Sequence, residues 1–241
     1  MYRTLVLVVL ACILATSHAG AGDVSDELRE RLSQRLQEFD PEIRLDRVEA
    51  TPLPGIYQVV AQGQVAYMSE DGRYLVQGDI VDLEVGASLS DAVRGELVID
   101  QLEAHGEERM IVYTPPDGAD HTVTVFTDID CPYCRQMHQR MDDYHAEGIE
   151  IRYVQMPRAG VGTGSYHKAV SVYCADDQLA AMDAAKAGET PEQRECDNPV
   201  ESQLELARSI GVNATPTFID EQGRMHRGLV EPADLASRLQ Q

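Results

Sequence analysis

The residues of this sequence best suited to chemistry are two cysteines separated by two residues, Cys131 and Cys134. The β-branched run 123–127 predicts a buried strand, and no further helix breaker follows Pro132, so the pair is expected where a strand gives way to a helix. Pro132 suits the first helical position, because its missing N–H has no partner to lose there. Only Cys131 would then lie near the free N–H groups and the positive end of the helix dipole, which favours its thiolate.

Two thiols in this arrangement can carry out disulfide exchange. We expect Cys131 to be the nucleophile, and Cys134, one turn further and more buried, to be the resolving thiol. A lowered pKa adds little to the rate of attack, but it improves the leaving group and stabilises the reduced form by about 1.4 kcal/mol per unit. The chemistry requires Cys131 to be ionised at neutral pH and open to large protein partners.

A pair of this kind can also hold zinc or haem. Zinc sites usually include a second such pair or two closely spaced histidines, and neither follows here. A c-type haem would need histidine at position 135, which is Arg135. We therefore expect no metal and no organic cofactor.

The charge of the chain limits its partners. The 241 residues can form one large or two modest domains. They include 41 acidic and 20 basic residues, for a net charge of −21. A surface of this sign repels phosphate groups, so neither nucleic acid nor an anionic membrane is expected as a partner.

Residues 1–19 have the pattern of a secretory signal peptide. A single early cation, Arg3, precedes an apolar run that is too short to span a membrane, and small residues lead up to Ala19. Cleavage is expected after Ala19, with Ala21 as the less favoured position. A lipoprotein signal ending at Cys12 would be unusually short, so we expect Cys12 to be removed with the signal peptide.

Four cysteines remain in the exported chain, and their spacing suggests two pairs. Cys131 and Cys134 would pair reversibly, whereas Cys174 and Cys196 would close a loop of about 22 residues. In the chain-entropy model such a bridge stabilises the fold by roughly 3 to 3.5 kcal/mol. We expect a structural disulfide, and a second redox couple remains the alternative.

Residues 20–85 are expected to form a small α+β domain. An amphipathic helix comes first, with apolar residues at three- and four-residue steps: Val24, Leu28, Leu32, Leu36 and Phe39. Short β-like runs follow at residues 57–61, 64–68, 74–77 and 80–85. A domain this small would be marginal alone, so we expect it to pair with its copy along a sheet edge as a homodimerisation domain. Packing on the chain's own second domain is the alternative.

Residues 86–109 are expected to form a linker helix rather than core. Ser88 offers an N-cap, and Gly95 weakens the helical pattern. One face would carry the apolar residues Leu89, Val93, Leu97 and Leu102.

Residues 110–241 are expected to form the second domain. Strands are predicted at residues 110–113, 123–127 and 150–156, a helical insertion at 164–209, and a terminal helix at 232–239. Thr215 and Pro216 precede another strand. Pro216 could be an ordinary edge residue or a cis proline facing the redox site, and both readings stay open.

This order of elements resembles the thioredoxin fold of the bacterial periplasmic thiol:disulfide interchange proteins, the DsbC and DsbG family. The likeness covers nearly all of the mature chain, and it is carried by residues 131–134, 67–79, 125–128 and 156–160 together with Cys174 and Cys196. It implies an α/β (α+β) chain in which a C-terminal thioredoxin-like domain with a helical insertion is joined by a linker helix to a small N-terminal α+β dimerisation domain.

The resemblance also implies roles for residues and partners. Cys131 and Cys134 match the nucleophile and the resolving thiol, and Cys174 with Cys196 the structural disulfide. The active-site loop that faces the substrate would comprise Pro132, Tyr133, Thr215 and Pro216. The family forms a homodimer with a V-shaped cleft in the periplasm. Misfolded disulfide-containing secreted proteins would be the substrates, and a membrane thiol reductase of the DsbD type would supply electrons.

Some features depart from this pattern. The dipeptide Pro132-Tyr133 is similar to that of DsbG and of glutaredoxins, whereas DsbC has Gly-Tyr; glutaredoxins lack the signal peptide, the N-terminal domain and the insertion. Thioredoxins place a buried carboxylate where this chain has Val125, so the proton of Cys134 needs another route, such as water. The histidines 138 and 145 are expected to be solvated helix residues.

We therefore expect a periplasmic disulfide isomerase and reductase that reshuffles incorrect disulfides through a mixed disulfide on Cys131. One alternative is a DsbG-like chaperone and reductase that protects single cysteines from oxidation. The other is a DsbA-like thiol oxidase, which would act as a monomer.

Overall fold

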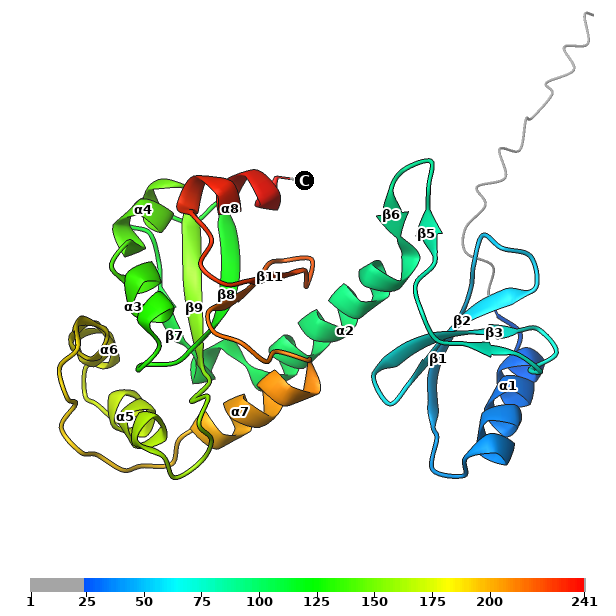
Figure 1. The fold of residues 1–241 in the computed structure, drawn as a ribbon, viewed down its shortest axis with the longest axis horizontal. Helices are drawn as coiled ribbons and strands as arrows, with labels where there is room; N and C mark the ends of the chain where they lie inside the picture. Colours follow the sequence, from blue (N-terminus) through cyan, green and yellow to red (C-terminus); the bar gives the residue numbers. More distant parts are fainter. Residues whose placement is uncertain (1–23, 241) are drawn as a thin grey trace, which may run out of the picture. The chain divides into compact units, whose positions relative to one another are not determined.

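The structure, a computed structural model, describes residues 24–240 of the chain (Figure 1). The signal peptide predicted at residues 1–19 lies outside this range. The chain forms two compact units, one ending at Gly78 and the other beginning at Asp79. Within the described range, no helix is both long enough and apolar enough to cross a membrane.

The N-terminal unit packs one helix on an antiparallel sheet. Helix α1 (Asp26–Phe39) is followed by β1 (Leu45–Ala50), β2 (Ile56–Ala61), β3 (Gln64–Ser69) and β4 (Leu75–Val76), and the strands lie in this order. Ser25 caps α1, because its Oγ accepts a hydrogen bond of 3.2 Å from the N–H of Leu28. The predicted apolar stripe forms the core with the sheet at Leu28, Leu32, Leu36, Val48, Val59 and Met68. Phe39, predicted on the same stripe, is 80% exposed.

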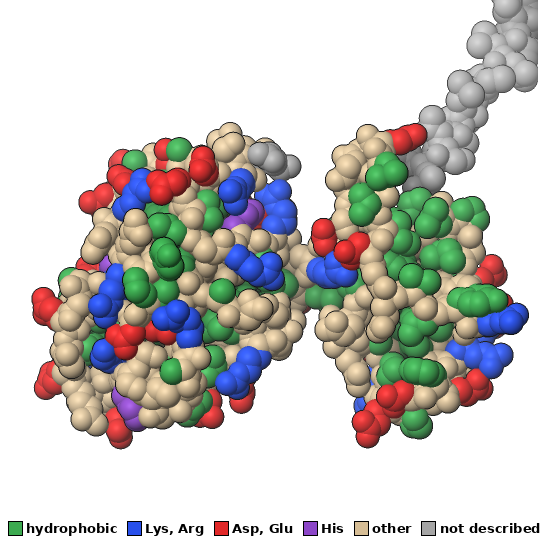
Figure 2. All heavy atoms as spheres, in the orientation of Figure 1, with side chains coloured by type: hydrophobic (Ala, Val, Ile, Leu, Met, Phe, Trp, Pro, Cys, Tyr) green, Lys and Arg blue, Asp and Glu red, His purple; other side chains and the backbone are tan. Residues whose placement is uncertain are grey.

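Strand β4 leaves apolar side chains exposed at an edge of this sheet. It pairs with β3 on one side, and the structure gives it no strand partner on the other within residues 24–240. Hydrophobic side chains gather on the face of the N-terminal unit seen in Figure 2. The exposed residues at and beside β4 are Tyr74, Leu75 and Val76.

The second unit begins with a small hairpin and a long helix. Strands β5 (Val81–Asp82) and β6 (Ala87–Ser88) pair with each other and do not extend the N-terminal sheet. Helix α2 (Leu89–His105) follows, and the hydroxyl of Ser88 caps it by accepting a hydrogen bond of 3.1 Å from the N–H of Asp91. The predicted N-cap is therefore correct.

Helix α2 does more than connect two domains. Val98 and Leu102 are buried in a core cluster that includes Phe126 and Val154. The expectation that this helix stays out of the core is wrong for its second half. The buried apolar positions also differ from the prediction, because Val98 takes the place of Leu97.

A mixed five-stranded sheet forms the centre of the second unit. After the short 3₁₀ turn η1 (Glu107–Arg109), its strands are β7 (Ile111–Tyr113), β8 (His121–Thr127), β9 (Ile149–Gln155), β10 (Thr217–Ile219) and β11 (Met225–Arg227). They lie in the order β11-β10-β8-β9-β7, with β8 and β9 parallel and the other pairs antiparallel. This sheet and its covering helices confirm the predicted thioredoxin-like fold.

Helices cover both faces of the sheet (Figure 1). One core cluster contains residues of α3 (Pro132–His138), α4 (Met141–Ala146), α5 (Gly164–Tyr173), α6 (Gln178–Ala187) and α8 (Pro232–Leu239). The other contains residues of α2 and α7 (Val200–Ser209). Side chains alternate along β8, so Val125 belongs to the first cluster and Phe126 to the second. Helices α5, α6 and α7 form the predicted helical insertion.

Candidate active site

The two candidate catalytic cysteines lie at the start of α3, directly after β8. Cys131 is the N-cap residue, Pro132 occupies the first turn, and Cys134 is inside the helix. Both cysteines are free thiols. Local sequence accounts for this placement, because the β-branched strand ends at Thr127 and proline favours a helix start.

Neither thiol is open to solvent. Cys131 and Cys134 are each 0% exposed, although Tyr133 between them is 61% exposed. The expectation that Cys131 is open to large protein partners is therefore wrong for this reduced form. A substrate can reach the sulfur only after neighbouring residues have moved.

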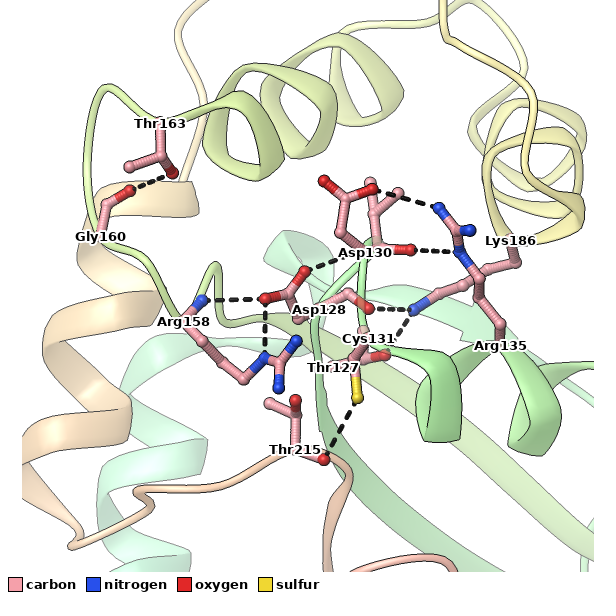
Figure 3. Close-up of polar contacts among 11 residues, drawn as sticks. Thr127, Asp128, Asp130, Cys131, Arg135, Arg158, Gly160, Thr163, Lys186 and Thr215 are labelled. Carbon is pink, nitrogen blue, oxygen red and sulfur yellow. Dashed lines mark hydrogen bonds and ion pairs between the residues drawn. The ribbon is translucent and has the colours of Figure 1, made fainter.

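The loop at Thr215 and Pro216 faces Cys131. The peptide bond between these two residues is cis, which answers the question that the sequence left open. The Cys131 thiol donates a hydrogen bond of 3.4 Å to the Thr215 carbonyl (Figure 3). The Thr215 hydroxyl is buried and has no other partner in the described part of the chain, so it is available to the sulfur.

The surroundings of Cys131 favour its thiolate. Burial raises the pKa of the Cys131 thiol, but hydrogen bonds from the Thr215 side chain and from Cys134, with the positive charge of Arg158, outweigh burial. The pKa therefore lies below its usual value, in the predicted direction.

Arg158 is held beside the thiols by a buried carboxylate. Asp128 is 3% exposed, and its Oδ2 accepts hydrogen bonds of 3.0 Å from both the backbone N–H and the Nε of Arg158. Its Oδ1 accepts another, of 2.8 Å, from the N–H of Asp130 (Figure 3). Sequence reasoning gave neither Asp128 nor Arg158 a role, although both lie in segments that carried the family resemblance.

The surroundings of Cys134 act in the opposite direction. Burial raises the pKa of the Cys134 thiol, and the charge of Lys186 and hydrogen bonds from Asp128 and Thr127 only partly offset it. Lys186 comes from α6 and is 1% exposed. Its Nζ donates hydrogen bonds of 2.6 Å to the Thr127 hydroxyl and 3.1 Å to the Asp128 carbonyl (Figure 3).

Sequence reasoning missed Lys186. The one available signal was its spacing, because Lys186 follows Met182 by four residues and so falls on the apolar stripe of a helix. A lysine on such a stripe is buried unless its stem reaches the surface.

His138 is not the solvated residue that was predicted. It is buried, and its ring nitrogens lie 3.1 Å from the hydroxyl of Tyr153 and 3.0 Å from the carboxylate of Asp183. Burial, followed by the charge of Lys186, lowers the pKa of His138. His145 is half-buried beside the backbone of β7.

The other two cysteines are bonded to each other. Cys174 is the C-cap residue of α5, and Cys196 lies 22 positions later in the segment before α7, with an S–S distance of 2.01 Å. Within residues 24–240, no cluster of three histidine, cysteine or acidic side chains could hold a metal ion.

Comparisons with known proteins agree with this geometry. Residues 108–241 match the thioredoxin-like domain family, and residues 17–91 match the disulfide bond isomerase protein N-terminal domain. Thiol:disulfide interchange protein DsbC of Haemophilus influenzae is 32% identical over 236 residues, which cover 98% of this chain and 97% of the relative. DsbC of Escherichia coli K12 is 32% identical over 193 residues, or 80% of each chain.

A solved structure shows the same fold. The crystal structure of a disulfide interchange protein from Neisseria gonorrhoeae aligns with a TM-score of 0.50 and 27% identity, over 56% of this chain and 99% of that one. Two domain matches and relatives that span almost the whole chain lead to one assignment. The chain belongs to the DsbC family of thiol:disulfide interchange proteins, as a thioredoxin-fold enzyme of the disulfide isomerase type.

Proposed function

We propose that this isomerase reshuffles incorrect disulfides in misfolded secreted proteins, with Cys131 as the nucleophile and Cys134 as the resolving thiol. The observation that carries the proposal is the pair of free thiols at the start of α3, whose pKa values are shifted in opposite directions. The Cys131 thiolate attacks one sulfur of a substrate disulfide, and the other sulfur leaves as a thiolate. A substrate thiol then releases Cys131 to complete isomerisation, or Cys134 releases it to complete reduction.

The active-site loop would receive the substrate. We assign this role to Pro132, Tyr133, Thr215 and Pro216, because Tyr133 is exposed beside the thiols and the Thr215 carbonyl contacts Cys131. Since Cys131 has no exposed surface, part of this loop moves as the substrate enters. The remaining pair, Cys174 and Cys196, would serve stability alone.

A scrambled multi-disulfide protein tests this mechanism. Refolding is compared with wild type, Cys131→Ala and Cys134→Ala. We expect no recovery of the substrate with Cys131→Ala, whereas Cys134→Ala should still isomerise but accumulate mixed disulfides, because it lacks the resolving thiol. Recovery that is equally fast with Cys131→Ala would show that the thiol is not the active element. The DsbC relatives favour isomerisation over a DsbG-like protective role and over a DsbA-like oxidase.

The match to the family's N-terminal domain supports a homodimer, and we propose residues 20–85 as the dimerisation domain and 86–109 as the linker. The exposed apolar edge at β4 is the surface best suited to pair with a second copy. In light scattering we expect a dimer for wild type and a monomer for Val76→Lys, because charge on an edge strand opposes pairing. Leu53→Lys, at a similarly exposed position outside any strand, should remain a dimer. The reverse pattern would contradict this assignment.

We place the protein in the periplasm, delivered there by a signal peptide at residues 1–19. A catalytic dithiol must be kept reduced in an oxidising compartment, which supports a membrane thiol reductase of the DsbD type as a partner. In cells lacking such a reductase, trapping with an alkylating reagent should find Cys131 and Cys134 as a disulfide. Thiols that stay reduced there would argue against this partner.

A further inference from the structure

Lys186 is a buried cation whose hydrogen-bond partners within residues 24–240 are uncharged. The residue is 1% exposed, and its ammonium donates to the Thr127 hydroxyl and the Asp128 carbonyl. It also lies 5.6 Å from the centre of the Tyr153 ring. Removing an ammonium group from water is costly unless a negative charge compensates it. The nearby groups that can become negative include the thiols of Cys131 and Cys134. The ammonium of Lys186 therefore lies where it can stabilise a thiolate.

Thr127 connects Lys186 to the resolving thiol. A hydroxyl has two acceptor lone pairs and a single hydrogen. The Thr127 oxygen accepts from Lys186, so its own hydrogen is free to donate to the sulfur of Cys134, where its hydrogen bond favours the thiolate. Thr127 therefore lies between the ammonium of Lys186, which it contacts directly, and the thiol of Cys134, whose pKa it lowers.

Other candidate proton acceptors near Cys134 already have partners. The carboxylate of Asp128 is held by Arg158 and by a backbone N–H. Both ring nitrogens of His138 are hydrogen-bonded, to Tyr153 and to Asp183. Lys186 is the titratable group whose hydrogen bond leads toward the sulfur.

We propose that Lys186, acting through the hydroxyl of Thr127, is the positioning residue that takes the proton of Cys134 when this thiol resolves the mixed disulfide. The inference rests on the proposed function. In the starting state, the Cys134 thiol donates to Thr127, and Thr127 donates to the neutral amine of Lys186. Both protons shift along these hydrogen bonds, which leaves a Cys134 thiolate and a lysine ammonium that donates to Thr127, the contact seen between Nζ and Oγ1.

The transfer completes a balanced exchange. The Cys134 thiolate attacks the sulfur of Cys131, the bond between Cys131 and the substrate breaks, and the electron pair leaves with the substrate sulfur as a thiolate. The two enzyme cysteines are oxidised to a disulfide and the substrate disulfide is reduced. When a dithiol partner later reduces the enzyme, Lys186 returns the proton to Cys134 by the same path.

The charges around Lys186 suit this role. Burial lowers the pKa of Lys186 to about 8, so both its neutral and charged forms are populated near neutral pH. The titratable and charged groups that face it are Cys131, Cys134, Asp128, Arg135, His138 and Tyr153. Loss of its charge should therefore change the pH dependence of the resolving step.

A two-step reaction with 5,5′-dithiobis(2-nitrobenzoate) isolates that step. In stopped flow, attack by Cys131 releases the first thionitrobenzoate in a concentration-dependent phase. Attack by Cys134 on the resulting mixed disulfide releases the second in a concentration-independent phase. Wild type is compared with Lys186→Met, which keeps the length of the side chain, and with Lys168→Met, which removes the chain's other lysine.

We expect Lys186→Met to slow the second phase at neutral pH by at least about tenfold and to move its pH profile upward, because general acid–base assistance is lost. The first phase should stay within about threefold. Lys168→Met should leave the second phase and its pH profile as in wild type, because Lys168 pairs with Asp130 and not with Thr127. A second phase that is unchanged in Lys186→Met overturns the proposal. So does a second phase that is slowed equally at every pH, because structural damage alone would have that effect.

Thr127 gives an independent test if Lys186→Met does not fold. Thr127→Val removes the hydroxyl and should reproduce the shifted pH profile, whereas Thr127→Ser keeps it and should restore the wild-type profile. Equal profiles for these two variants overturn the proposal. Failure of the proposed function would be seen separately, as a first phase in wild type that is no faster than in Cys131→Ala.

Discussion

Gly95, in the middle of α2, provides a test in which two physical effects predict opposite signs. A glycine inside a helix costs about 0.8 to 1.0 kcal/mol relative to alanine, so helix propensity predicts that Gly95→Ala is stabilising. In the structure, however, a Cβ added at Gly95 would lie 2.1 Å from the carbonyl oxygen of Gln222. A Cβ added at Gly223 would likewise lie 2.1 Å from the carbonyl oxygen of Gly95.

The steric effect should be the larger one. Ordinary contacts of a Cβ begin at 3.4 Å, so the helix and the turn at Gln222 must separate by more than an ångström. Overpacking typically costs about 1 to 3 kcal/mol, and a backbone carbonyl cannot rotate away as a side chain can. The cost should therefore fall in the upper half of that range, about 2 to 3 kcal/mol. After the gain in propensity of about 1 kcal/mol is subtracted, we expect Gly95→Ala to lower the free energy of unfolding by about 1 to 2 kcal/mol.

Urea unfolding followed by circular dichroism measures the effect. Gly164→Ala is the matched control, because Gly164 is also in a helix, is exposed, and its added Cβ would meet nothing within 4 Å. We expect that variant to be stabilised by about 0.4 to 1 kcal/mol through the unfolded state. If Gly95→Ala is stabilised as much as Gly164→Ala, the close contact between α2 and the turn does not exist in solution.

Three further results are expected. Arg158→Ala should move the pH profile of iodoacetamide labelling of Cys131 upward, because a nearby positive charge is lost; an unmoved profile would contradict this. Replacing Cys174 and Cys196 together by serine should lower the free energy of unfolding by about 3 kcal/mol in denaturant titrations, and a loss below about 1 kcal/mol would show the bridge to be dispensable. Burial raises the pKa of Asp220, but hydrogen bonds from a histidine and an arginine outweigh it and lower that pKa. The contribution of the Asp220 carboxylate to the free energy of unfolding is therefore complete above the unfolded pKa of about 3.9, and it is lost as pH falls through the lower folded pKa. Asp220→Asn should flatten the acid side of a plot of the free energy of unfolding against pH.

The structure also changes how one glycine is interpreted. In the sequence, Gly95 counted against a helix, because glycine is a poor helix former. In the fold it allows α2 to approach the turn at Gln222, which lies more than a hundred residues away in the chain. Propensity is a property of neighbouring residues and carries no information about such a contact.

The burial of some single side chains was predicted wrongly for a similar reason. Phe39 follows the spacing of the α1 stripe, but it is the last residue of the helix and its side chain is exposed. His138 was expected in solvent, yet Tyr153 and Asp183 come from distant segments to enclose and bind it. Spacing predicts which face of a helix is apolar, but not how far the neighbouring element extends.

The local sequence alone determined the strand that ends at Thr127, the helix start at Cys131 and the cap at Ser88. Each of these features depends on residues within about four positions of one another. The cis bond before Pro216, the closure over Cys131 and the approach of Lys186 to Thr127 were decided by tertiary structure. The contacts of Cys131 with Thr215 and of Lys186 with Thr127 join segments separated by 84 and 59 residues, and only packing of the folded chain brings such segments within hydrogen-bonding distance.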